Sequence, residues 1–506
     1  MPDKTQEVKN SKSPAKTLGI TVKKSENFSE WFTQVCSESG AQLADVRYGV
    51  QGFIVHRPWA MRILRKMYEE FEREVEADGH EPYLFPTVIP EENLLTEKEH
   101  AGFTPEVFWV EHAGDTKLER RVALRPTGET QIYPMYSLWI RSYKDLPWKG
   151  YQSRLTVFRN EMTTRPFFRG REFMFFETHD VFQKHEDALG QIKKDMGMME
   201  RVVGQKLKLP FVFFQRPKWD KFLGANDTFA SDTLNPDGRR SQLSSTHDLG
   251  HNFAKPFHIV FDDENGKESF GWQTCFGPGI WRIMASLIAI HGDDQGLVLP
   301  VEFAPVQVVI VPILFANKPQ DNAVVLESCE KVKTIAESAG LRVKLDTREE
   351  SPGFKFNDWE MKGVPLRVEV GPKDVVQAQC VVVRRTDRKK TIIPVAQLAQ
   401  TLSGEAAAVD AEISRRAQAY FADSTREAKD FVELKKLFAS YRGFIKVPWC
   451  TVSLEGKKCA EILKAETEGG IVCGTPFGKE ETPKKGSVCV VCNKPAGHVV
   501  WVAKSI

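Results

Sequence analysis

An arginine and a glutamate two residues apart form the most informative feature of the chain. Phe158-Arg159-Asn160-Glu161 is followed, after a loop rich in arginine and phenylalanine, by Arg171-Glu172-Phe173. On a strand, Arg159 and Glu161 would point to the same face and could reach one ligand. Arginine offers a fork for a phosphate, glutamate can orient a second polar group or hold a metal, and Phe173 offers a flat face to a base. A nucleotide suits this set; an amphipathic hairpin with a surface salt bridge is the alternative.

A further arginine ends a glycine-rich segment. Cys275-Phe276-Gly277-Pro278-Gly279-Ile280-Trp281-Arg282 leads directly into the apolar residues 283–290, which predict a helix. Glycine-rich backbone at the start of a helix lets a ligand approach closely, and Arg282 stands where it can bind a phosphate. This segment favours the nucleotide over the surface salt bridge.

The elements that must position these residues begin with a predicted helix and strand over residues 57–90. Apolar residues recur at helical spacing at Met61, Leu64, Tyr68, Phe71 and Val75. Gly79 can end this helix, and an apolar run with strand character follows over residues 81–90. Because Pro86 donates no backbone hydrogen bond, we expect that strand at an edge or an interface.

Length and composition indicate a globular protein of several domains. A chain of 506 residues is longer than an ordinary single domain with one hydrophobic core. Its contents of 41% hydrophobic and 27% charged residues are typical of globular proteins. No stretch offers the roughly 18 uninterrupted apolar residues of a membrane span, and residues 1–24 lack a signal-peptide core. We therefore expect a cytoplasmic protein that spans no membrane. Since 70 basic residues nearly balance 68 acidic ones, any surface for nucleic acid must be local.

In chain order, the segments over residues 57–90, 158–173 and 275–290 resemble the three signature motifs of class II aminoacyl-tRNA synthetases. The sequence between them narrows the resemblance to the prolyl-tRNA synthetase family of archaeal and eukaryotic type. The matching runs are 124–129, which contains a Thr-x-Glu loop, 165–173, 247–253, 291–300 and 351–356. The match extends from about Phe28 to Ile506.

The resemblance implies a fold of three domains. We expect an α+β catalytic domain with an antiparallel sheet over residues 26–300, after a polar, disordered tail over 1–25. An α/β anticodon-binding domain over 301–405 and a small α+β zinc-binding domain over 406–506 would follow. Short β-branched runs at 306–311, 341–345, 365–370 and 380–384 alternate with helical stretches around 323–338 and 395–402, which also favours a compact α/β domain. Residues 406–440 predict a helix.

The activity that the resemblance implies is activation of proline by ATP to prolyl-adenylate, then transfer to the 3′ end of tRNA(Pro). Neither step needs a covalent nucleophile, so the protein mainly aligns reactants and neutralises charge. By position, Arg159 would bridge the α-phosphate and the amino acid carboxylate, Glu161 would place ATP and its Mg²⁺, and Arg282 would hold the γ-phosphate. Further ATP contacts would be Arg171, Phe173, Gln242 and Ser245, with Arg169 assisting. A structural role is the alternative for each.

Proline has two N–H donors on a small apolar ring, so its pocket needs acceptors and an apolar wall. The resemblance assigns Thr127 and Glu129 as acceptors, Arg159 to the carboxylate, and Phe175 to a wall position where the family usually has tryptophan. His179 and His247 complete the pocket, although a lone histidine is more often structural. The third motif departs from the common Ser-Trp-Gly-x-Ser/Thr-Thr-Arg, which leaves its hydroxyl contacts in doubt.

Anticodon recognition is expected in the second domain. Residues that align with the family's guanine-reading positions are Glu360, Arg367, Lys373 and Asp374. Carboxylates can accept from the Watson–Crick donors of guanine, and Arg or Lys can donate to its O6 and N7. The unbroken match over residues 357–367 favours binding over the alternative of solvated charges.

Five of the nine cysteines crowd the last 57 residues, which in a cytosolic chain indicates metal rather than disulfides. Cys489 and Cys492 form a strong zinc half-site. Upstream, the spacing between Cys450 and Cys459 is longer than the usual spacing between two cysteines that bind one zinc ion. Cys473 could replace one of them as a ligand. We favour Cys450, Cys459, Cys489 and Cys492 around a structural Zn²⁺; a reduced cluster without metal is the alternative.

We therefore predict a homodimeric enzyme of this family without a cis-editing domain. One alternative is a catalytically inactive, synthetase-derived RNA-binding or regulatory protein, which would not need the ATP-binding set. Another is a class II synthetase for threonine or serine. The Thr-x-Glu loop and the run Ser351 to Phe356 disfavour that second alternative.

Overall fold

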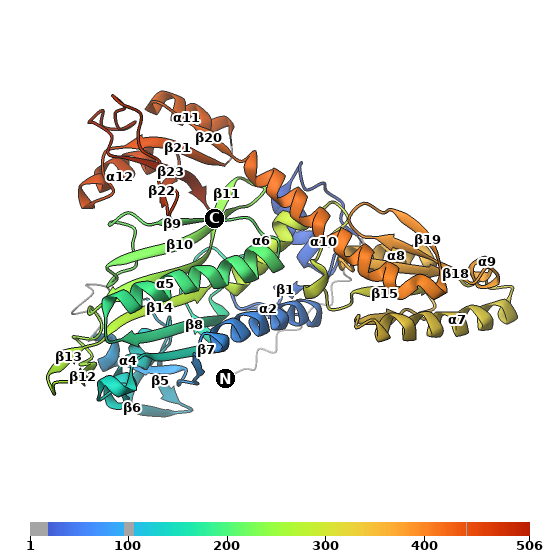
Figure 1. Ribbon diagram of the computed structural model, residues 1–506, viewed down its shortest axis with the longest axis horizontal. Helices are drawn as coiled ribbons and strands as arrows, with labels where there is room; N and C mark the ends of the chain where they lie inside the picture. The colour runs from blue at the N-terminus through green and yellow to red at the C-terminus, as the bar shows by residue number, and fades with distance from the viewer. Residues whose placement is uncertain (1–18, 96–105, 442) are drawn as a thin grey trace, which may run out of the picture.

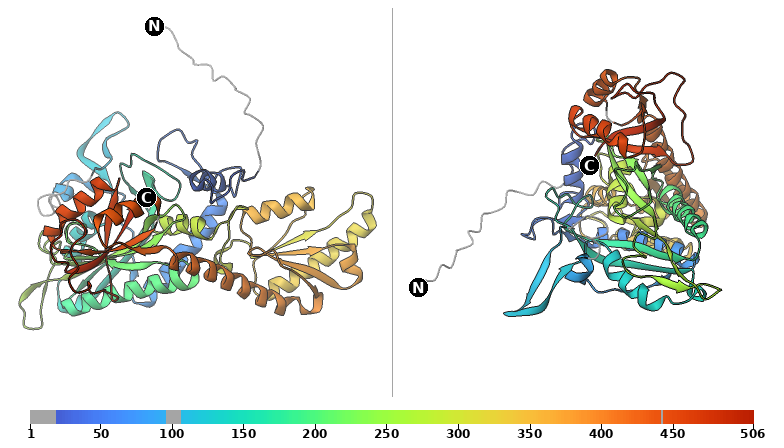
Figure 2. Two further views of the ribbon diagram at one scale, coloured as in Figure 1. Left: turned by 90° about the horizontal axis from the view of Figure 1, so that it is seen from above. Right: turned by 90° about the vertical axis from the view of Figure 1, so that its left-hand side faces the viewer.

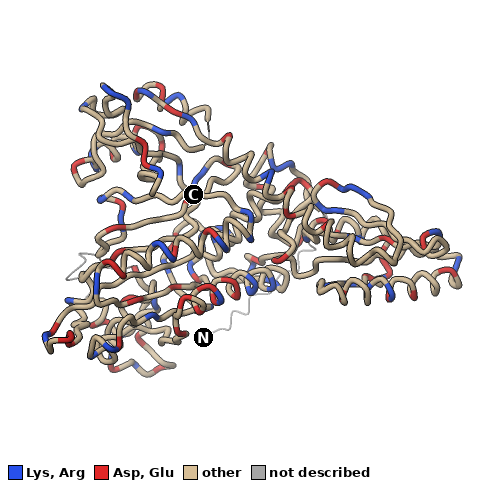
Figure 3. Tube along the Cα trace, in the orientation of Figure 1, with Lys and Arg blue, Asp and Glu red and all other residues tan. Residues whose placement is uncertain are grey.

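A computed structural model describes residues 19–95, 106–441 and 443–506 of the chain. Figure 1 shows an elongated molecule in which a large sheet occupies one end and a five-stranded sheet the other. Basic and acidic residues are interspersed along the trace in every part (Figure 3). Among the described residues, no helix is both long and apolar enough to cross a membrane.

The large sheet has 11 strands in the order β20-β21-β23-β22-β9-β10-β11-β14-β8-β7-β3. Its catalytic part is antiparallel from β9 to β7, as predicted for this fold class. The strands of that part are β7 (Trp148–Phe158), β8 (Glu172–Phe182), β9 (Val212–Gln215), β10 (Asp227–Leu234), β11 (Arg239–Gly250) and β14 (Trp272–Pro278). The short strand β3 (Glu81–Pro82) pairs in parallel with β7 at the edge.

Three helices cover one face of this sheet: α2 (Pro58–Ala77), α5 (His185–Met199) and α6 (Ile280–His291) (Figure 1). The predicted apolar stripe of α2 is buried from Leu64 to Val75. It shares one core with Phe176 of β8 and Phe276 of β14. Side chains alternate along a strand, so the neighbours of Phe176, at positions 175 and 177, face the opposite side, where the candidate site lies.

Smaller elements surround this sheet. Helix α1 (Phe28–Cys36) precedes the pair β1 (Ala44–Asp45) and β2 (Val55–His56), and helix α4 (Glu129–Trp139) follows the three-stranded sheet of β4 (Val88–Pro90), β5 (Trp109–Ala113) and β6 (Thr116–Leu124). The hairpin of β5 and β6 projects from the body (Figure 2). Strands β12 (Val260–Asp262) and β13 (Glu268–Phe270) form a separate pair.

The second unit is a five-stranded sheet in the order β16-β15-β17-β18-β19. Its strands are β15 (Val308–Pro312), β16 (Val343–Leu345), β17 (Leu366–Val370), β18 (Gln379–Arg384) and β19 (Lys390–Pro394). Its helices are α7 (Pro319–Ser338), α8 (Pro352–Met361), α9 (Pro372–Val376) and α10 (Leu398–Ala422). The sequence patterns located four of the strands and missed β19. This edge strand has 5 residues, and only Ile393 among them is buried.

The C-terminal strands extend the catalytic sheet rather than form a sheet of their own. They are β20 (Thr425–Glu427), β21 (Phe444–Trp449), β22 (Gly470–Pro476) and β23 (His498–Ser505), accompanied by α11 (Phe431–Ser440) and α12 (Lys457–Glu466). Strand β22 pairs with β9, and the end of β23 pairs in parallel with β11. Helix α10 runs from the five-stranded unit towards these strands (Figures 1 and 2).

Three local predictions were wrong. The strand expected over 81–90 is two short strands, β3 and β4, with Pro86 between them. The helix expected over 406–440 is the end of α10, strand β20 and helix α11. Residues 1–18 of the expected disordered tail lie outside the described residues, but Ile20 and Val22 pack on the main core and the Lys24 amide donates to Asp294 Oδ1 at 2.8 Å.

Candidate active site

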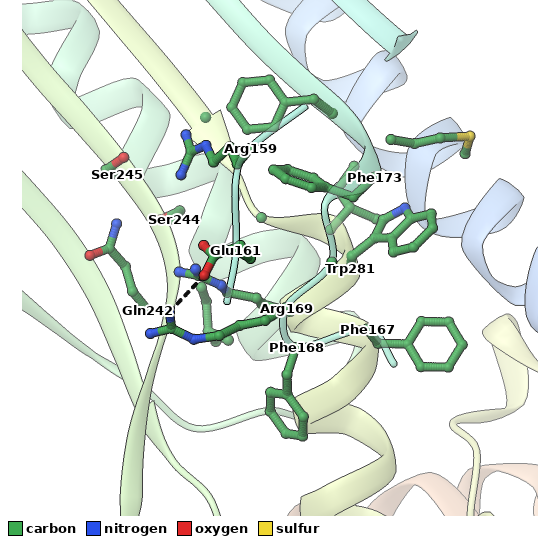
Figure 4. Close-up of a pocket in the computed structure, with 18 residues that line it drawn as sticks. Arg159, Glu161, Phe167, Phe168, Arg169, Phe173, Gln242, Ser244, Ser245 and Trp281 are labelled. Carbon is green, nitrogen blue, oxygen red and sulfur yellow. Dashed lines mark hydrogen bonds and ion pairs between the residues drawn. The ribbon is translucent and has the colours of Figure 1, made fainter. Parts of the chain in front are cut away.

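A cavity lies on the face of the large sheet opposite α2. Eight of the predicted site residues line it: Arg159, Glu161, Arg169, Phe173, Phe175, Gln242, Ser245 and Arg282. In Figure 4, Gln242, Ser244 and Ser245 lie across the cavity from Arg159 and Phe173.

Arg159 and Glu161 lie just beyond the end of β7, so the expectation that strand alternation aligns them was wrong. The loop is held instead by the returning chain. The Arg159 amide donates to the Arg171 carbonyl at 2.9 Å, and Arg171 Nε donates to the Glu161 carbonyl at 3.0 Å. Arg169 Nη1 lies 3.1 Å from Glu161 Oε2. Arg171 therefore supports the loop and is not among the residues that line the cavity.

Positive charge converges on the cavity. Desolvation, together with the charges of the nearby Arg159 and Arg169, lowers the pKa of Arg282 to about 10. Among the described residues, neither Arg159 nor Arg282 donates a side-chain hydrogen bond to the protein. Since guanidinium groups carry five donors, such unpartnered groups facing a cavity suit a polyanion.

A β-bulge aligns the residues of β11 with the cavity. Asp232 of β10 pairs with Gln242 and Ser231 pairs with Ser244, so Leu243 has no partner. The extra residue interrupts the alternation at this point of β11, and the four consecutive residues 242–245 all line the cavity.

The Thr-x-Glu loop carries two of the predicted proline contacts. Thr127 Oγ1 donates to Glu129 Oε2 at 2.6 Å, and Glu129 is the first residue of α4 and is buried. Arg125 fixes the loop by donating to the carbonyls of Thr156 at 2.7 Å and Phe85 at 3.0 Å. A side chain at Gly128 would place its Cβ 2.0 Å from Glu177 Oε1, so glycine is needed there.

The pKa values of the two predicted histidines shift in opposite directions. His179 Nε2 lies 3.2 Å from Glu177 Oε2, and its Nδ1 lies 2.9 Å from the Tyr133 hydroxyl. Burial opposes the charge of His179, but Glu177 and Glu129 outweigh it and raise its pKa. Burial lowers the pKa of His247 to about 3, so this ring is neutral and bonds to Thr228 and Ser245.

Several residues of the site had no individual prediction. Glu177 is buried beside His179, Tyr133 holds the His179 ring, and Cys275 Sγ lies 3.9 Å from Glu129 Oε1. Period-2 alternation on β8 could have found Glu177, because it shares a face with Phe173, Phe175 and His179. No local pattern marks Tyr133, since it reaches the site from the side of α4.

The predicted anticodon residues divide into two pairs. Glu360 of α8 and Arg367 of β17 form an ion pair at 2.9 Å, and Arg367 also pairs with Glu369 at 3.0 Å. Lys373 is exposed on α9, whereas Asp374 caps that helix through the Gly371 amide at 2.9 Å. Part of this charge is therefore satisfied within the protein.

The four favoured cysteines converge. The sulfur atoms of Cys450, Cys459, Cys489 and Cys492 all lie within 4.8 Å of one another. Cys450 and Cys459 are 3.8 Å apart, which equals the edge of a tetrahedron with Zn–S bonds of about 2.3 Å. Cys473 lies elsewhere, in the middle of β22. The donor set and its spacing fit a closed tetrahedral site for a thiophilic ion.

Comparisons with known proteins agree along most of the chain. A model of the tRNA synthetase class II core domain (G, H, P, S and T) matches residues 108–291, one of an anticodon binding domain matches 307–405, and one of the prolyl-tRNA synthetase C-terminal region matches 431–506. The proline–tRNA ligase of Thermofilum pendens is 52% identical over 96% of this chain and 99% of its own. The chain belongs to the prolyl-tRNA synthetase family.

Other members of the prolyl-tRNA synthetase family are similar over nearly their full length. The proline–tRNA ligase of Pyrococcus abyssi is 39% identical over 95% of this chain and 98% of its own. Among solved structures, Giardia lamblia prolyl-tRNA synthetase in complex with prolyl-adenylate superposes with a TM-score of 0.91 at 34% identity, covering 97% of this chain and all of that one. The Cryptosporidium parvum synthetase, complexed with halofuginone and AMPPNP, gives 0.89 at 31% identity, covering 96% and 99%.

Proposed function

We propose that this chain activates proline with ATP and transfers it to tRNA(Pro). The observation that carries the proposal is the surroundings of Arg159. This arginine lines a cavity with Glu161 and Arg282. Burial lowers its pKa, and the negative charges of Glu161, Glu129 and Glu177 act in the opposite direction. An amino acid and a triphosphate would meet at this arginine.

Adenylation requires the proline carboxylate to attack the α-phosphate while negative charge develops there. Arg159 is the group that can contact both reactants, and Arg282 can neutralise the departing pyrophosphate. Glu161 and Mg²⁺ would hold the remaining phosphate oxygens, with Glu161 oriented by Arg169. Phe173 would stack on adenine, and Gln242 and Ser245 would contact the nucleoside.

The ammonium of proline needs acceptors at the inner end of the site. Glu129 supplies a carboxylate and Thr127 a hydroxyl, already joined to each other. Phe175 would supply apolar surface to the proline ring. His247 would complete the pocket without adding positive charge, because its ring is neutral. His179 acts beside them, held by Tyr133 and Glu177.

Amino acid-dependent exchange of pyrophosphate into ATP tests the proposal, with each amino acid supplied in turn. Exchange should require proline. No exchange with any amino acid, together with retained binding of tRNA, would favour the alternative of a catalytically inactive RNA-binding protein. Exchange with threonine or serine in preference to proline would also contradict the proposal.

The remaining partners belong to the same proposal. Glu360, Arg367, Lys373 and Asp374 would read the anticodon, with the internal ion pairs exchanged for contacts to guanine. A structural Zn²⁺ would occupy the four-cysteine cluster, because four thiolates leave no open coordination position. The predicted division at 25, 300 and 405 stays a proposal; its last boundary falls inside α10. A reaction on tRNA also suits a cytoplasmic location.

Dimerisation is proposed from apolar surface near the edge strand β3. Leu84 is 86% exposed and Leu138 is 56% exposed, and both lie close to Pro86 or to the aromatic stack of Tyr83 with Trp139. Exposed apolar side chains gathered at a sheet edge favour association. Light scattering at micromolar concentration should give the mass of two chains; the mass of one would contradict a homodimer.

A further inference from the structure

Arg216, which follows strand β9, is buried where the catalytic strands meet the C-terminal strands. Its Nη1 and Nη2 donate to the two carboxylate oxygens of Asp232 at 2.8 Å and 2.7 Å. The side chains of Arg216 and Asp232 are 2% and 0% exposed. A buried pair of this kind adds little net stability by itself, because desolvation offsets most of the attraction. Its other contacts give it a different role.

The same guanidinium joins two further segments. Nη2 donates to Gln242 Oε1 at 3.1 Å, and Nη1 donates to the Cys473 carbonyl at 2.6 Å. Gln242 lines the cavity of the candidate active site. Cys473 belongs to β22 in the C-terminal part of the chain. Arg216 therefore connects a cavity residue to the strand that extends the catalytic sheet.

Two β-bulges create these contacts. Leu243 is the unpaired residue of the bulge in β11, next to Gln242. Cys473 is the unpaired residue of a bulge in β22, where the pairing with β23 skips one position. A bulge interrupts the ladder and re-aims side chains and backbone groups. Here one bulge accompanies the turn of Gln242 towards the cavity, and the other leaves the Cys473 carbonyl free to accept from Arg216.

Close packing of β22 on β9 keeps that carbonyl in place. Gly474 follows the bulge with a φ of +127°, and a Cβ at this position would lie 2.2 Å from the Gln215 carbonyl oxygen. Only glycine permits both the backbone angle and the approach. Gln215 directly precedes Arg216, so the fit between the two strands sets the position of the arginine.

The chemistry of the guanidinium fixes the orientation of the Gln242 amide. Arginine has only donors, so the oxygen of the carboxamide must face it and the NH₂ group must point elsewhere. We propose that Arg216 is a positioning residue for the nucleotide: held by Asp232 and the Cys473 carbonyl, it presents the Gln242 NH₂ group as a donor to an acceptor of ATP. This inference rests on the proposed function, in which Gln242 contacts ATP.

The test compares substitutions at Arg216 and Gln242. Arg216→Lys keeps the charge but loses the guanidinium fork that donates to four acceptor oxygens on three residues. Asp232 keeps a positively charged partner in this variant, because Arg240 Nη1 lies 2.9 Å from Asp232 Oδ2. We expect the KM for ATP in pyrophosphate exchange to rise about ten-fold and the KM for proline to change less than two-fold. Calorimetry with a non-hydrolysable ATP analogue should show the same weakening.

A double-substitution cycle separates positioning from general stability. In a Gln242→Ala background, Arg216→Lys should raise the KM for ATP by less than two-fold, because the group that it orients is already absent. A ten-fold rise that persists without Gln242, or equal rises in the KM values for ATP and proline, would overturn the proposal. Lys218→Met is the matched control, since it removes a neighbouring ion pair to Asp227 that touches no cavity residue, and should leave both constants unchanged.

A second variant covers the case in which Arg216→Lys does not fold. Gln242→Glu keeps an acceptor for Arg216 but removes the N–H donor, so the analogue should bind about ten-fold more weakly. Unchanged binding would overturn the proposal. If the unsubstituted protein lacked proline-dependent exchange, the proposed function would fail, and the calorimetric comparison would still decide the role of Arg216.

Discussion

Arg385 of the five-stranded unit forms a bidentate ion pair with Asp293, which follows helix α6 of the catalytic unit. Arg385 Nη2 lies 2.5 Å from Asp293 Oδ1 and Nη1 lies 2.7 Å from Oδ2. The Nε atom of the same arginine donates to the Glu360 carbonyl at 2.9 Å. One guanidinium thus joins a predicted anticodon residue to the helix whose first turn carries Arg282.

We expect Arg385→Ala to lower aminoacylation of tRNA about ten-fold and to leave proline-dependent pyrophosphate exchange within two-fold. The reason is that the pair orients the two units, whereas adenylation occurs within one of them. Arg384→Ala is the matched control, because Arg384 pairs with Asp387 and Glu405 inside the same unit. Equal loss in both assays would contradict an orienting role.

The pH dependence of this pair follows from the pKa of Asp293. Burial opposes its ionisation, but hydrogen bonds and charge from Arg385 outweigh burial and hold the pKa below 3.8. A lowered carboxyl pKa gives stability that is present above the unfolded value and is lost as the pH falls through the folded one. Parent and Arg385→Ala should therefore converge in melting temperature only below about pH 4.

Much of the fold and the site was predictable because the informative residues are local in sequence. Arg159, Glu161 and Phe173 lie on one hairpin. Arg282 lies in the first turn of α6, and the glycines that precede this helix in the sequence indicated where it begins. The antiparallel sheet was implied by the family resemblance, whereas four of the five strands of the second unit and the cysteine cluster followed from local patterns.

The rest depends on contacts that no local pattern carries. Arg216 and the Cys473 carbonyl are 257 residues apart, and they meet because β22 pairs with β9 beside Arg216 and a bulge at Cys473 interrupts the pairing of β22 with β23. Likewise, Tyr133 reaches His179 only because α4 packs beside β8. The position of a bulge and the packing of a helix depend on how the strands pair in the complete sheet. The contacts that result from them can therefore be seen only in the structure.

Replacing Arg159 should abolish adenylation without unfolding the protein. Its side chain faces the cavity and donates no hydrogen bond to the described protein, so Arg159→Ala removes little that stabilises the fold. Loss of a group that binds developing charge typically costs 10²–10³-fold in rate, roughly the loss we expect in pyrophosphate exchange. A circular dichroism melt within a degree or two of the parent is the control. Exchange within a few-fold of the parent would refute the assignment.

Glu129→Gln should weaken proline selectively. The buried carboxylate is replaced by a neutral amide of the same shape, so the ammonium of proline loses a charge-assisted partner worth about 1.5–3 kcal/mol. The KM for proline should rise about 10- to 100-fold, and that for ATP should change little. Glu172→Gln, at an exposed position at the start of β8, is the control. Equal changes in both constants would place Glu129 outside the pocket.

Elemental analysis should find about one zinc per chain in protein purified without added metal. Cys489→Ser removes one of four converging thiols and should lower both the zinc content and the melting temperature. Cys473→Ser should retain the zinc, because that sulfur lies outside the cluster. Loss of zinc from the Cys473 variant, or unchanged melting of a metal-free protein, would contradict the four-cysteine assignment.

The chain should not clear mischarged alanyl-tRNA. Alanine is smaller than proline, so a pocket shaped for the ring cannot exclude it, and each missing methylene is worth only about 1–3 kcal/mol. Correction in cis would need a second hydrolytic site. Residues 174–274, all described, form β8 to β13 with α5 and pack against the catalytic sheet, which leaves no separate domain in this interval.

Incubation of preformed alanyl-tRNA for proline with the pure protein tests this expectation. Its deacylation should proceed at the rate in buffer alone, and prolyl-tRNA in a parallel reaction controls for general ester hydrolysis. Arg159→Ala adds a further comparison, because it disables synthesis without altering any other part of the surface. Deacylation of alanyl-tRNA well above the buffer rate, retained in that variant, would demonstrate an editing site apart from the adenylation cavity, since its activity would not depend on the arginine that the cavity requires.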